Sequence, residues 1–255
     1  MRLIDSHCHF DDDAFLPDRA AAWRRAQDAG VVAQVLPALA HATWPRLKRV
    51  AETFPGLYPA YGLHPMYLDE HRVEHLAELR RWIEDEQPLA IGECGLDYFV
   101  ESLDRVRQME LFVAQVDIAL LYDLPLIIHA RRAVDDVLMV LRRRPGARGV
   151  IHSFAGSEQQ ARAFIGLGFS LGFGGPVTYA RANRLRGLVR ELPLESILIE
   201  TDAPDQPGSL HRGERNEPAF LPEILHEIAA LRGEDAGHVA EITSRNACRL
   251  FGIAP

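Results

Sequence analysis

The sequence predicts an α/β protein, a single-domain (β/α)8 TIM barrel that spans residues 1–255. Short apolar runs alternate about eight times with amphipathic helical segments, which is typical of a parallel sheet built from strand–helix–strand units. A length of 255 residues suits one such barrel, because these barrels are about 250 residues long. An open doubly wound sheet is the alternative, but the chain has neither a G-x-G-x-x-G after its first strand nor a P-loop motif.

Each expected strand is a short apolar run that is bounded by turn residues or charge. In chain order the strands are Leu3–His7, Val31–Leu39, Leu57–Leu63, Leu89–Cys94, Leu126–His129, Gly149–His152, Phe169–Phe173 and Ile197–Thr201. The expected helices lie between and after them: Asp18–Ala29, Trp44–Phe54, Val73–Glu86, Leu103–Tyr122, Ala133–Arg144, Glu158–Leu167, Arg184–Leu192, Phe220–Leu231 and Ala236–Phe251. The stretch Asp205–Glu217 is rich in Gly, Pro and charge and is expected to form a long loop.

Composition limits the possible environments and partners. No run of about 18 apolar residues occurs, so we expect no membrane span, and we expect no signal peptide at the N-terminus. The three cysteines, Cys8, Cys94 and Cys248, have no paired spacing, which favours the reducing cytoplasm. A net charge of −8 argues against a broad basic surface for duplex DNA. We expect a monomer or weak oligomer without an obligate protein partner.

A His-x-His pair ends the first strand. Residues i and i+2 of a strand point to the same face, so His7 and His9 can reach one point in space, while Cys8 faces the other way. Two convergent imidazoles are the beginning of a metal site. The pair is weak evidence alone, since two histidines also occur together by chance.

More acids and histidines follow at the ends of other strands, where a barrel has its active site. They are His64, Glu93, His129, His152 and Asp202. A buried group of this kind is costly unless a cation compensates it. The sequence therefore predicts a metal site.

Several short motifs resemble the TatD-like metal-dependent deoxyribonucleases, a branch of the amidohydrolase-type barrels. They are the His-x-His, Gly-Glu-Cys-Gly-Leu-Asp-Tyr, His-Ala-Arg, Ile-His-Ser-Phe-Ala-Gly, Glu-Thr-Asp-Ala-Pro and Arg-Asn-Glu-Pro, in this order. The resemblance covers residues 2 to about 252. Asp205 stands where many members have an aromatic residue, and in this respect the sequence resembles the YjjV-type subgroup. Ser153 stands where many members have cysteine.

The resemblance implies two divalent metal ions, Mg, Mn or Zn. It assigns His7, His9 and Asp202 to one ion, His129 and His152 to the second, and a bridging position to Glu93. In a related barrel type, a carboxylated lysine on the fourth strand bridges the two metals. Lys48 is the only lysine here and lies in a helical pattern. Composition therefore excludes a carboxylysine bridge and leaves Glu93, on the fourth strand, as the available substitute.

Charge favours a phosphodiester substrate. Two divalent ions would bring +4, and Glu93, Asp202 and a hydroxide would return −3, which leaves +1 for the anion. Asp202 and Glu93 are the predicted catalytic residues. His64 and Arg131 are expected to contact the phosphate, with Arg215 and Tyr98 as weaker candidates. Asp97 is expected to orient a ligand.

Three functions compete. The first is a two-metal phosphodiesterase, a 3′–5′ exonuclease-like deoxyribonuclease on DNA ends or single strands. The second is a hydrolase of another small ester or cyclic amide, because this scaffold supports many reactions. The third, a non-enzymatic metal protein, fits poorly, since structural sites are closed by four ligands. Outside the site, the four histidines 71, 75, 226 and 238 are expected on the surface, and His41 and His211 in loops that could rim the pocket. Cys8 and Cys94 are expected in the core.

Overall fold

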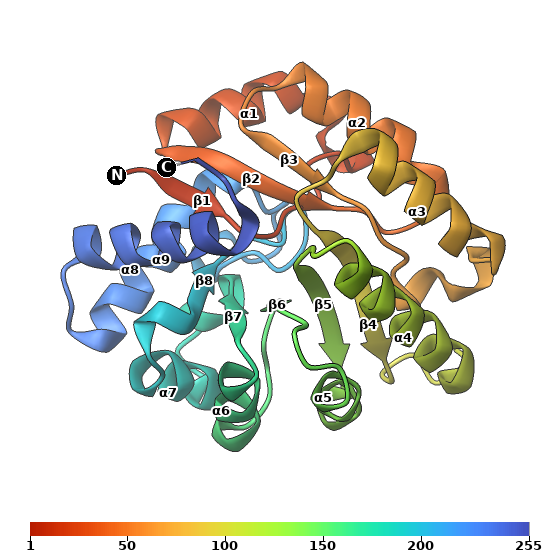
Figure 1. The fold of residues 1–255 in the computed structure, drawn as a ribbon. Coiled ribbons are helices and arrows are strands. Elements are labelled where there is room, and N and C mark those ends of the chain that lie inside the picture. Colours follow the sequence, from red (N-terminus) through yellow and green to blue (C-terminus); the bar gives the residue numbers. More distant parts are fainter. Residues whose placement is uncertain (255) are drawn as a thin grey trace. The chain divides into compact units, whose positions relative to one another are not determined.

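A computed structural model describes residues 1–254, in which eight strands alternate with nine helices (Figure 1). The strands are β1 Leu3–Asp5, β2 Val31–Pro37, β3 Leu57–Ala60, β4 Ile91–Asp97, β5 Leu126–Arg131, β6 Gly149–Ile151, β7 Phe169–Phe173 and β8 Ile197–Ile199. The helices are α1 Arg19–Asp28, α2 Trp44–Thr53, α3 Glu74–Glu86, α4 Arg105–Leu121, α5 Val134–Arg142, α6 Glu158–Gly166, α7 Asn183–Glu191, α8 Leu221–Arg232 and α9 Ala236–Phe251. The expected order of elements is confirmed.

Strand boundaries differ from the expected ones in a way that matters for the site. β4 and β5 extend into polar residues, because the parallel ladder between them pairs Gly95 with His129 and Asp97 with Arg131. β1 and β8 are shorter than expected and end at Asp5 and Ile199. The expected boundaries came from the ends of apolar runs in the sequence. The observed strands end where the hydrogen bonds between backbones end.

The chain divides into two compact units. The first contains Met1–Leu36, Val50–Tyr58 and the chain from Leu171 onward. Here β1 pairs in parallel with β2, and β7 with β8. Helix α9 packs on β1 and β8, and α8 packs between α7 and α9 (blue and teal in Figure 1).

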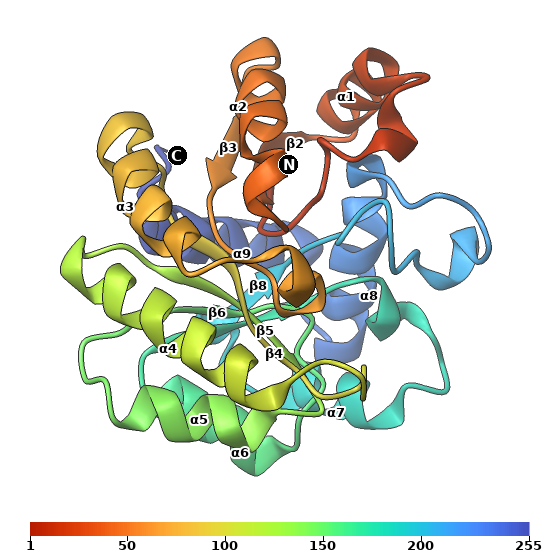
Figure 2. The ribbon, with the colours of Figure 1, turned by 90° about the vertical axis from the view of Figure 1, so that its right-hand side faces the viewer.

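The second unit contains Pro37–Arg49 and Pro59–Ser170. Its strands β4, β5 and β6 form parallel pairs in sequence order. Helix α4 runs along β4, and α5 lies beside α6 (Figure 2). The strands are buried on both faces and so consist of apolar runs such as Leu126–Ile128, as expected for parallel strands.

Local signals set several helix ends. The Asp104 carboxylate accepts hydrogen bonds from the first backbone N–H groups of α4, and Asp235 does the same at α9. Ser157 and Gln160 form a capping box at α6. Gly233 and Gly252 end α8 and α9 in the left-handed conformation that glycine adopts most easily. Among the described residues, no helix combines the length and the apolar character that crossing a membrane requires.

Candidate metal centre

The segments that follow β1 and β8 bring three side chains of the first unit together. Backbone hydrogen bonds continue past the strand ends: Asp202 N–H donates to the His7 carbonyl at 2.9 Å, and His9 N–H to the Ala203 carbonyl at 2.8 Å. Between these residues Cys8 turns into the core and is fully buried, as expected. We call His7, His9 and Asp202 the His7 cluster.

Asp5 fixes this arrangement and was missed by the sequence reasoning. Its buried carboxylate accepts from Thr201 N–H at 2.9 Å, from Thr201 Oγ1 at 2.5 Å and from His7 N–H at 3.3 Å. Burial raises the pKa of Asp5 to about 7, although these hydrogen bonds lower it. Asp5 therefore ties the end of β1 to the end of β8. Strand alternation, which places Asp5 on the same face as His7, could have revealed it.

The His7 cluster has the spacing of metal ligands. The Nε2 atoms of His7 and His9 lie 3.2 Å apart, and Asp202 Oδ1 lies 3.4 Å from the first and 3.5 Å from the second. A tetrahedral ion with bonds of about 2.0–2.1 Å separates its ligands by about 3.3–3.4 Å, and an octahedral ion by about 2.8–3.0 Å. The three buried atoms therefore fit around one small divalent ion.

Four side chains of the second unit form the Glu93 cluster: His64, Glu93, His129 and His152. Register places them, since Gly95 of β4 pairs with His129 of β5, and His152 N–H donates to the Ile128 carbonyl at 3.0 Å. Gly95 has a φ of +140°, and a Cβ atom there would lie 2.0 Å from the His129 carbonyl oxygen. Only glycine lets β4 and β5 approach so closely beside His129.

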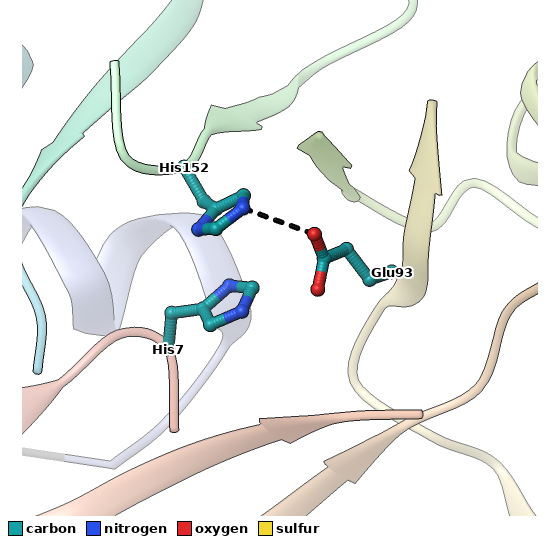
Figure 3. A group of neighbouring side chains, drawn as sticks. All are labelled: His7, Glu93 and His152. Atoms are coloured by element: carbon teal, nitrogen blue, oxygen red, sulfur yellow. Dashed lines mark ion pairs between the residues drawn. The ribbon is translucent and has the colours of Figure 1, made fainter. Parts of the chain in front are cut away.

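One carboxylate oxygen is the centre of the Glu93 cluster. Glu93 Oε1 lies 3.1 Å from His64 Nε2, 3.1 Å from His129 Nδ1 and 2.9 Å from His152 Nε2. The last of these ion pairs is drawn in Figure 3. His129 Nδ1 and His152 Nε2 are 3.3 Å apart. These separations again lie in the range for ligands of one small divalent ion.

Asp97 holds the His129 ring from behind, where a ligand-orienting residue would lie. Its Oδ2 accepts from His129 Nε2 at 2.9 Å. Burial raises the pKa of Asp97, but the hydrogen bonds from His129 and the backbone outweigh it and the net shift is downward. Burial lowers the pKa of His129, yet its bonds with Asp97 and Glu93 raise it overall. Asp97 thus fixes the tautomer and leaves Nδ1 facing Glu93.

The sequence matches the TatD related DNase family over residues 4–252. The chain belongs to the TatD family. It is 40% identical over 255 residues to YjjV of Escherichia coli K12, named an uncharacterized metal-dependent hydrolase, which covers 99% of this chain and 98% of that protein. It is 33% identical over 264 residues to the 3′–5′ ssDNA/RNA exonuclease TatD of Pantoea vagans, over 99% of this chain and 100% of that protein.

The crystal structure of Escherichia coli YjjV superposes on this chain with a TM-score of 0.95 at 38% identity, covering 99% of both chains. This likeness confirms the predicted fold class, the (β/α)8 arrangement of the TatD family. The predicted membership of the family, on the YjjV side, is confirmed as well. The chain is a metal-dependent hydrolase of the TatD family.

The four residues predicted to contact substrate in this TatD protein differ from one another in burial and in their partners. His64 belongs to the Glu93 cluster. Arg131, at the end of β5, is 46% exposed and its Nη1 lies 3.9 Å from Asp97 Oδ2. The guanidinium carbon of Arg105 lies over the Tyr98 ring, 4.5 Å from the ring centre. Burial, and after it the hydrogen bond with Asp136, raise the pKa of Tyr98 to about 12.

Arg215 already has protein partners for its guanidinium. It donates to Asp18 at 2.6 and 3.0 Å, to Glu217 at 2.6 Å and to the Ala14 carbonyl at 2.8 Å. Arg25 joins the same two carboxylates at 2.7 Å each. We call Asp18, Arg25, Arg215 and Glu217 the Asp18 network. The predicted substrate contact of Arg215 would have to compete with these bonds.

We expect Arg215→Met to destabilise the protein by about 1–2 kcal/mol at pH 7. The hydrogen bond from Arg215 lowers the pKa of Asp18, and the network also lowers the pKa of Glu217, although burial alone would raise it. Charge-assisted hydrogen bonds contribute about 1.5–3 kcal/mol, and solvent reduces this at the partly exposed Asp18.

Because these folded-state pKa values are depressed, the stabilisation is present above about pH 4 and is lost as the pH falls through the folded values. Urea unfolding at pH 7 and pH 3 should therefore show a smaller loss in acid. An equal loss at both pH values, or a loss of activity without a loss of stability, would contradict a structural role.

Some expectations outside the clusters were wrong. His71 and His75 are each only 4% exposed, not on the surface. His71 Nε2 bonds the His64 carbonyl at 2.8 Å, and the His75 ring stacks on His41 at 4.3 Å. The polar residues beside them in the sequence hid this burial, since a helix buries only one stripe. His226 and His238 are exposed as expected.

Two further expectations are met. Cys94 is fully buried, as expected for a core thiol. Lys48 lies on α2 and its Nζ pairs with Glu86 Oε1 at 2.7 Å, so it is a helix residue paired with an acid of α3. His211 lies between β8 and α8, where its ring pairs with Glu214 and Glu223.

Proposed function

We propose that this protein is a phosphodiesterase, a deoxyribonuclease that acts in the manner of a 3′–5′ exonuclease on DNA ends or single strands. The observation that carries the proposal is the pair of buried clusters, each with imidazole and carboxylate atoms at ligand spacing. The TatD relative from Pantoea vagans is named as an exonuclease on single-stranded DNA and RNA. Because this chain belongs to the same family, hydrolysis of phosphodiester bonds in nucleic acid is the reaction that we propose for it.

We propose that each cluster holds one divalent ion. His7, His9 and Asp202 would hold the first, and His129, His152 and Glu93 the second, with Glu93 as the predicted bridge. When bound, such ions lower the pKa of water and neutralise the attacking and leaving oxygens of a phosphodiester. Imidazole-rich sites suit Zn or Mn, while many nucleases use Mg.

Asp202 is the proposed base for the attacking water. Its Oδ1 faces the two imidazoles of the His7 cluster, and its Oδ2 accepts a hydrogen bond from Gln206. The two oxygens therefore have separate tasks: Oδ1 belongs to the ligand set, and Gln206 fixes the rotation of the carboxylate. A carboxylate held in this way can orient a water molecule and take its proton.

The phosphate contacts are proposed to come from His64 and Arg131. His64 Nδ1 accepts from Met66 N–H at 3.2 Å, which directs Nε2 toward Glu93. Arg131 lies at the end of β5, and its guanidinium is beside Asp97 at the end of β4. A guanidinium offers two parallel donors that match a phosphate, and it remains charged at every relevant pH.

We expect Arg131→Ala to lower kcat/KM on a short single-stranded oligonucleotide by the equivalent of about 1.5–3 kcal/mol, the range for a charge-assisted hydrogen bond. The loss should be much smaller on a neutral ester, because that substrate has no anion for the guanidinium. Arg143→Ala is the matched control, since Arg143 is an exposed arginine at the C-terminal end of α5. Equal losses on both substrates would remove the phosphate role.

A substrate panel tests the proposal itself. The protein, loaded in turn with Mg²⁺, Mn²⁺ and Zn²⁺, would be assayed on single-stranded DNA, RNA, a small phosphodiester and a neutral ester or lactone. We expect hydrolysis of the phosphodiesters, with DNA as the best substrate. If the neutral ester were the best substrate, the protein would instead be a hydrolase of small esters or cyclic amides.

The three cysteines are free, as a reducing cytoplasm would keep them. We therefore propose a cytoplasmic enzyme, a monomer or weak oligomer whose partner is its DNA or small phosphodiester substrate.

A further inference from the structure

An exposed phenylalanine with two arginines lies close to the Glu93 cluster. Phe99 follows β4 and is 45% exposed. The guanidinium carbon of Arg131 lies 3.7 Å from the centre of its ring, and that of Arg132 lies 4.7 Å away. Single exposed apolar residues are ordinary, but two cations on one exposed ring are not. We call Phe99, Arg131 and Arg132 the Phe99 platform.

The backbone is shaped to bring both arginines to this ring. Neighbouring residues of a strand point to opposite faces, so Arg131 and Arg132 would normally diverge. Arg132 has a φ of +53°, the left-handed conformation that few residues other than glycine adopt. This turn at the end of β5 breaks the alternation and places the second guanidinium over Phe99. Strained backbone of this kind concentrates at binding and catalytic sites.

Asp97 connects the platform to the Glu93 cluster. One oxygen of its carboxylate accepts from the N–H groups of Phe99 at 2.9 Å and Val100 at 3.2 Å. The other oxygen accepts from His129 Nε2. A single buried carboxylate thus holds both the turn that presents Phe99 and the imidazole of a proposed metal ligand. Asp97 therefore fixes the position of the platform relative to the Glu93 cluster.

The charge of the platform is positive and only partly compensated. Asp97 is the acid beside Arg131, at 3.9 Å. Among residues 1–254, the guanidinium of Arg132 makes no hydrogen bond or ion pair, and Phe99 is the ring it lies over. Flat, weakly hydrated guanidinium groups and an aromatic ring are the surfaces on which proteins stack unpaired bases, and the same cations attract the flanking phosphates.

We propose that the Phe99 platform binds an unstacked nucleobase of the substrate, next to the phosphate that His64 and Arg131 are proposed to contact. This inference rests on the proposed phosphodiesterase function and names its substrate class: a nucleic acid strand with a free, unpaired base rather than a small phosphodiester. A base inside a duplex cannot stack on Phe99, so single strands and frayed ends are preferred over paired ends.

Binding tests the platform without turnover. The probes are five-nucleotide DNA strands with phosphorothioate linkages that resist hydrolysis, carrying 2-aminopurine at the 3′ or the 5′ end, in the presence of Mg²⁺. Stacking on Phe99 should quench the fluorescence of at least one probe. Phe99→Leu should abolish that quenching and raise Kd roughly 5- to 100-fold, the range for losing one base–aromatic stack. Phe99→Tyr should retain both, and Arg132→Asn, which tolerates a positive φ, should weaken binding.

Leu121→Ala is the matched control, because Leu121 is an exposed apolar residue at the far end of α4. If neither probe is quenched, or if Phe99→Leu binds and quenches like the parent protein, the platform is not a base site.

A second measurement separates this inference from the proposed function. The kcat/KM of the parent protein and of Phe99→Leu would be compared on an oligonucleotide and on the same strand with abasic terminal nucleotides. The parent should prefer the strand with bases, and Phe99→Leu should lose that preference while still cleaving both. If Phe99→Leu kept the full preference, the platform would be refuted and the phosphodiesterase would stand. If the parent cleaved neither strand but quenched the probe, the phosphodiesterase would be refuted and the base site would stand.

Discussion

Asp202→Asn is expected to lower kcat by at least about 100-fold, the scale of a lost general base, with a modest change in KM. Asparagine keeps the size and one oxygen for the His7 cluster but removes the negative charge and the basicity. Asp202 has a φ of +57°, and asparagine is one of the few residues that accept such a backbone. The substitution therefore tests chemistry and adds no backbone strain.

The measurement is steady-state kinetics on single-stranded DNA together with metal content. Asp205→Asn is the matched control, since it makes the same change three residues along the chain at an exposed carboxylate. A rise in KM with unchanged kcat would show that Asp202 binds substrate and does not handle the proton. Loss of bound metal in proportion to the loss of activity would show that its charge acts only as a ligand.

Glu93→Gln is expected to lower both the metal content and the activity by the largest margin of any substitution at the Glu93 cluster. Glu93 is 1% exposed, and its carboxylate faces three imidazole nitrogens within 3.1 Å. Removing its charge leaves a set of neutral or positive groups that no longer attracts a cation. Glutamine keeps the volume, so packing is preserved.

Elemental analysis should find about two ions per chain in the parent protein, as the proposed two-metal mechanism requires. Because Glu93 is the predicted bridge, Glu93→Gln and Glu93→Ala should lower the occupancy of both ions. Loss of a single ion would show that Glu93 belongs to one ion only. Glu74→Ala, on the exposed first turn of α3, is the control for the assay.

The clusters could be anticipated because their residues occupy a simple pattern. His7 and His9 stand two apart after an apolar run, and Glu93, His129 and His152 follow other apolar runs. Parallel strands have their carboxyl ends at one edge, so strand order along the chain already groups such side chains. Of the residues that support the clusters, Asp97 was expected to orient a ligand, whereas Asp5 was missed. Both act through hydrogen bonds whose partners are far away in the sequence.

The sequence also did not reveal the partners of two arginines at the surface, Arg131 of the Phe99 platform and Arg215 of the Asp18 network. Arg131 was expected to contact phosphate, but its stacking on Phe99 depends on the register between β4 and β5. Arg215 was expected to contact substrate because it lies in a family motif, yet its donors are directed at Asp18 and Glu217. An arginine side chain reaches several partners, and the sequence does not say which of them folding places nearby.

The sequence by itself determined the alternation of strands and helices, the TatD family and the residue types of both clusters. Period-2 and period-3.6 patterns and short motifs are local, so they can be read along the chain. The tertiary structure decided which atoms face each other: Oε1 of Glu93 toward three imidazoles, and Asp97 between His129 and the turn of Phe99. It also decided the burial of His71 and His75. These features depend on strand register and on packing between distant segments, which no local pattern encodes.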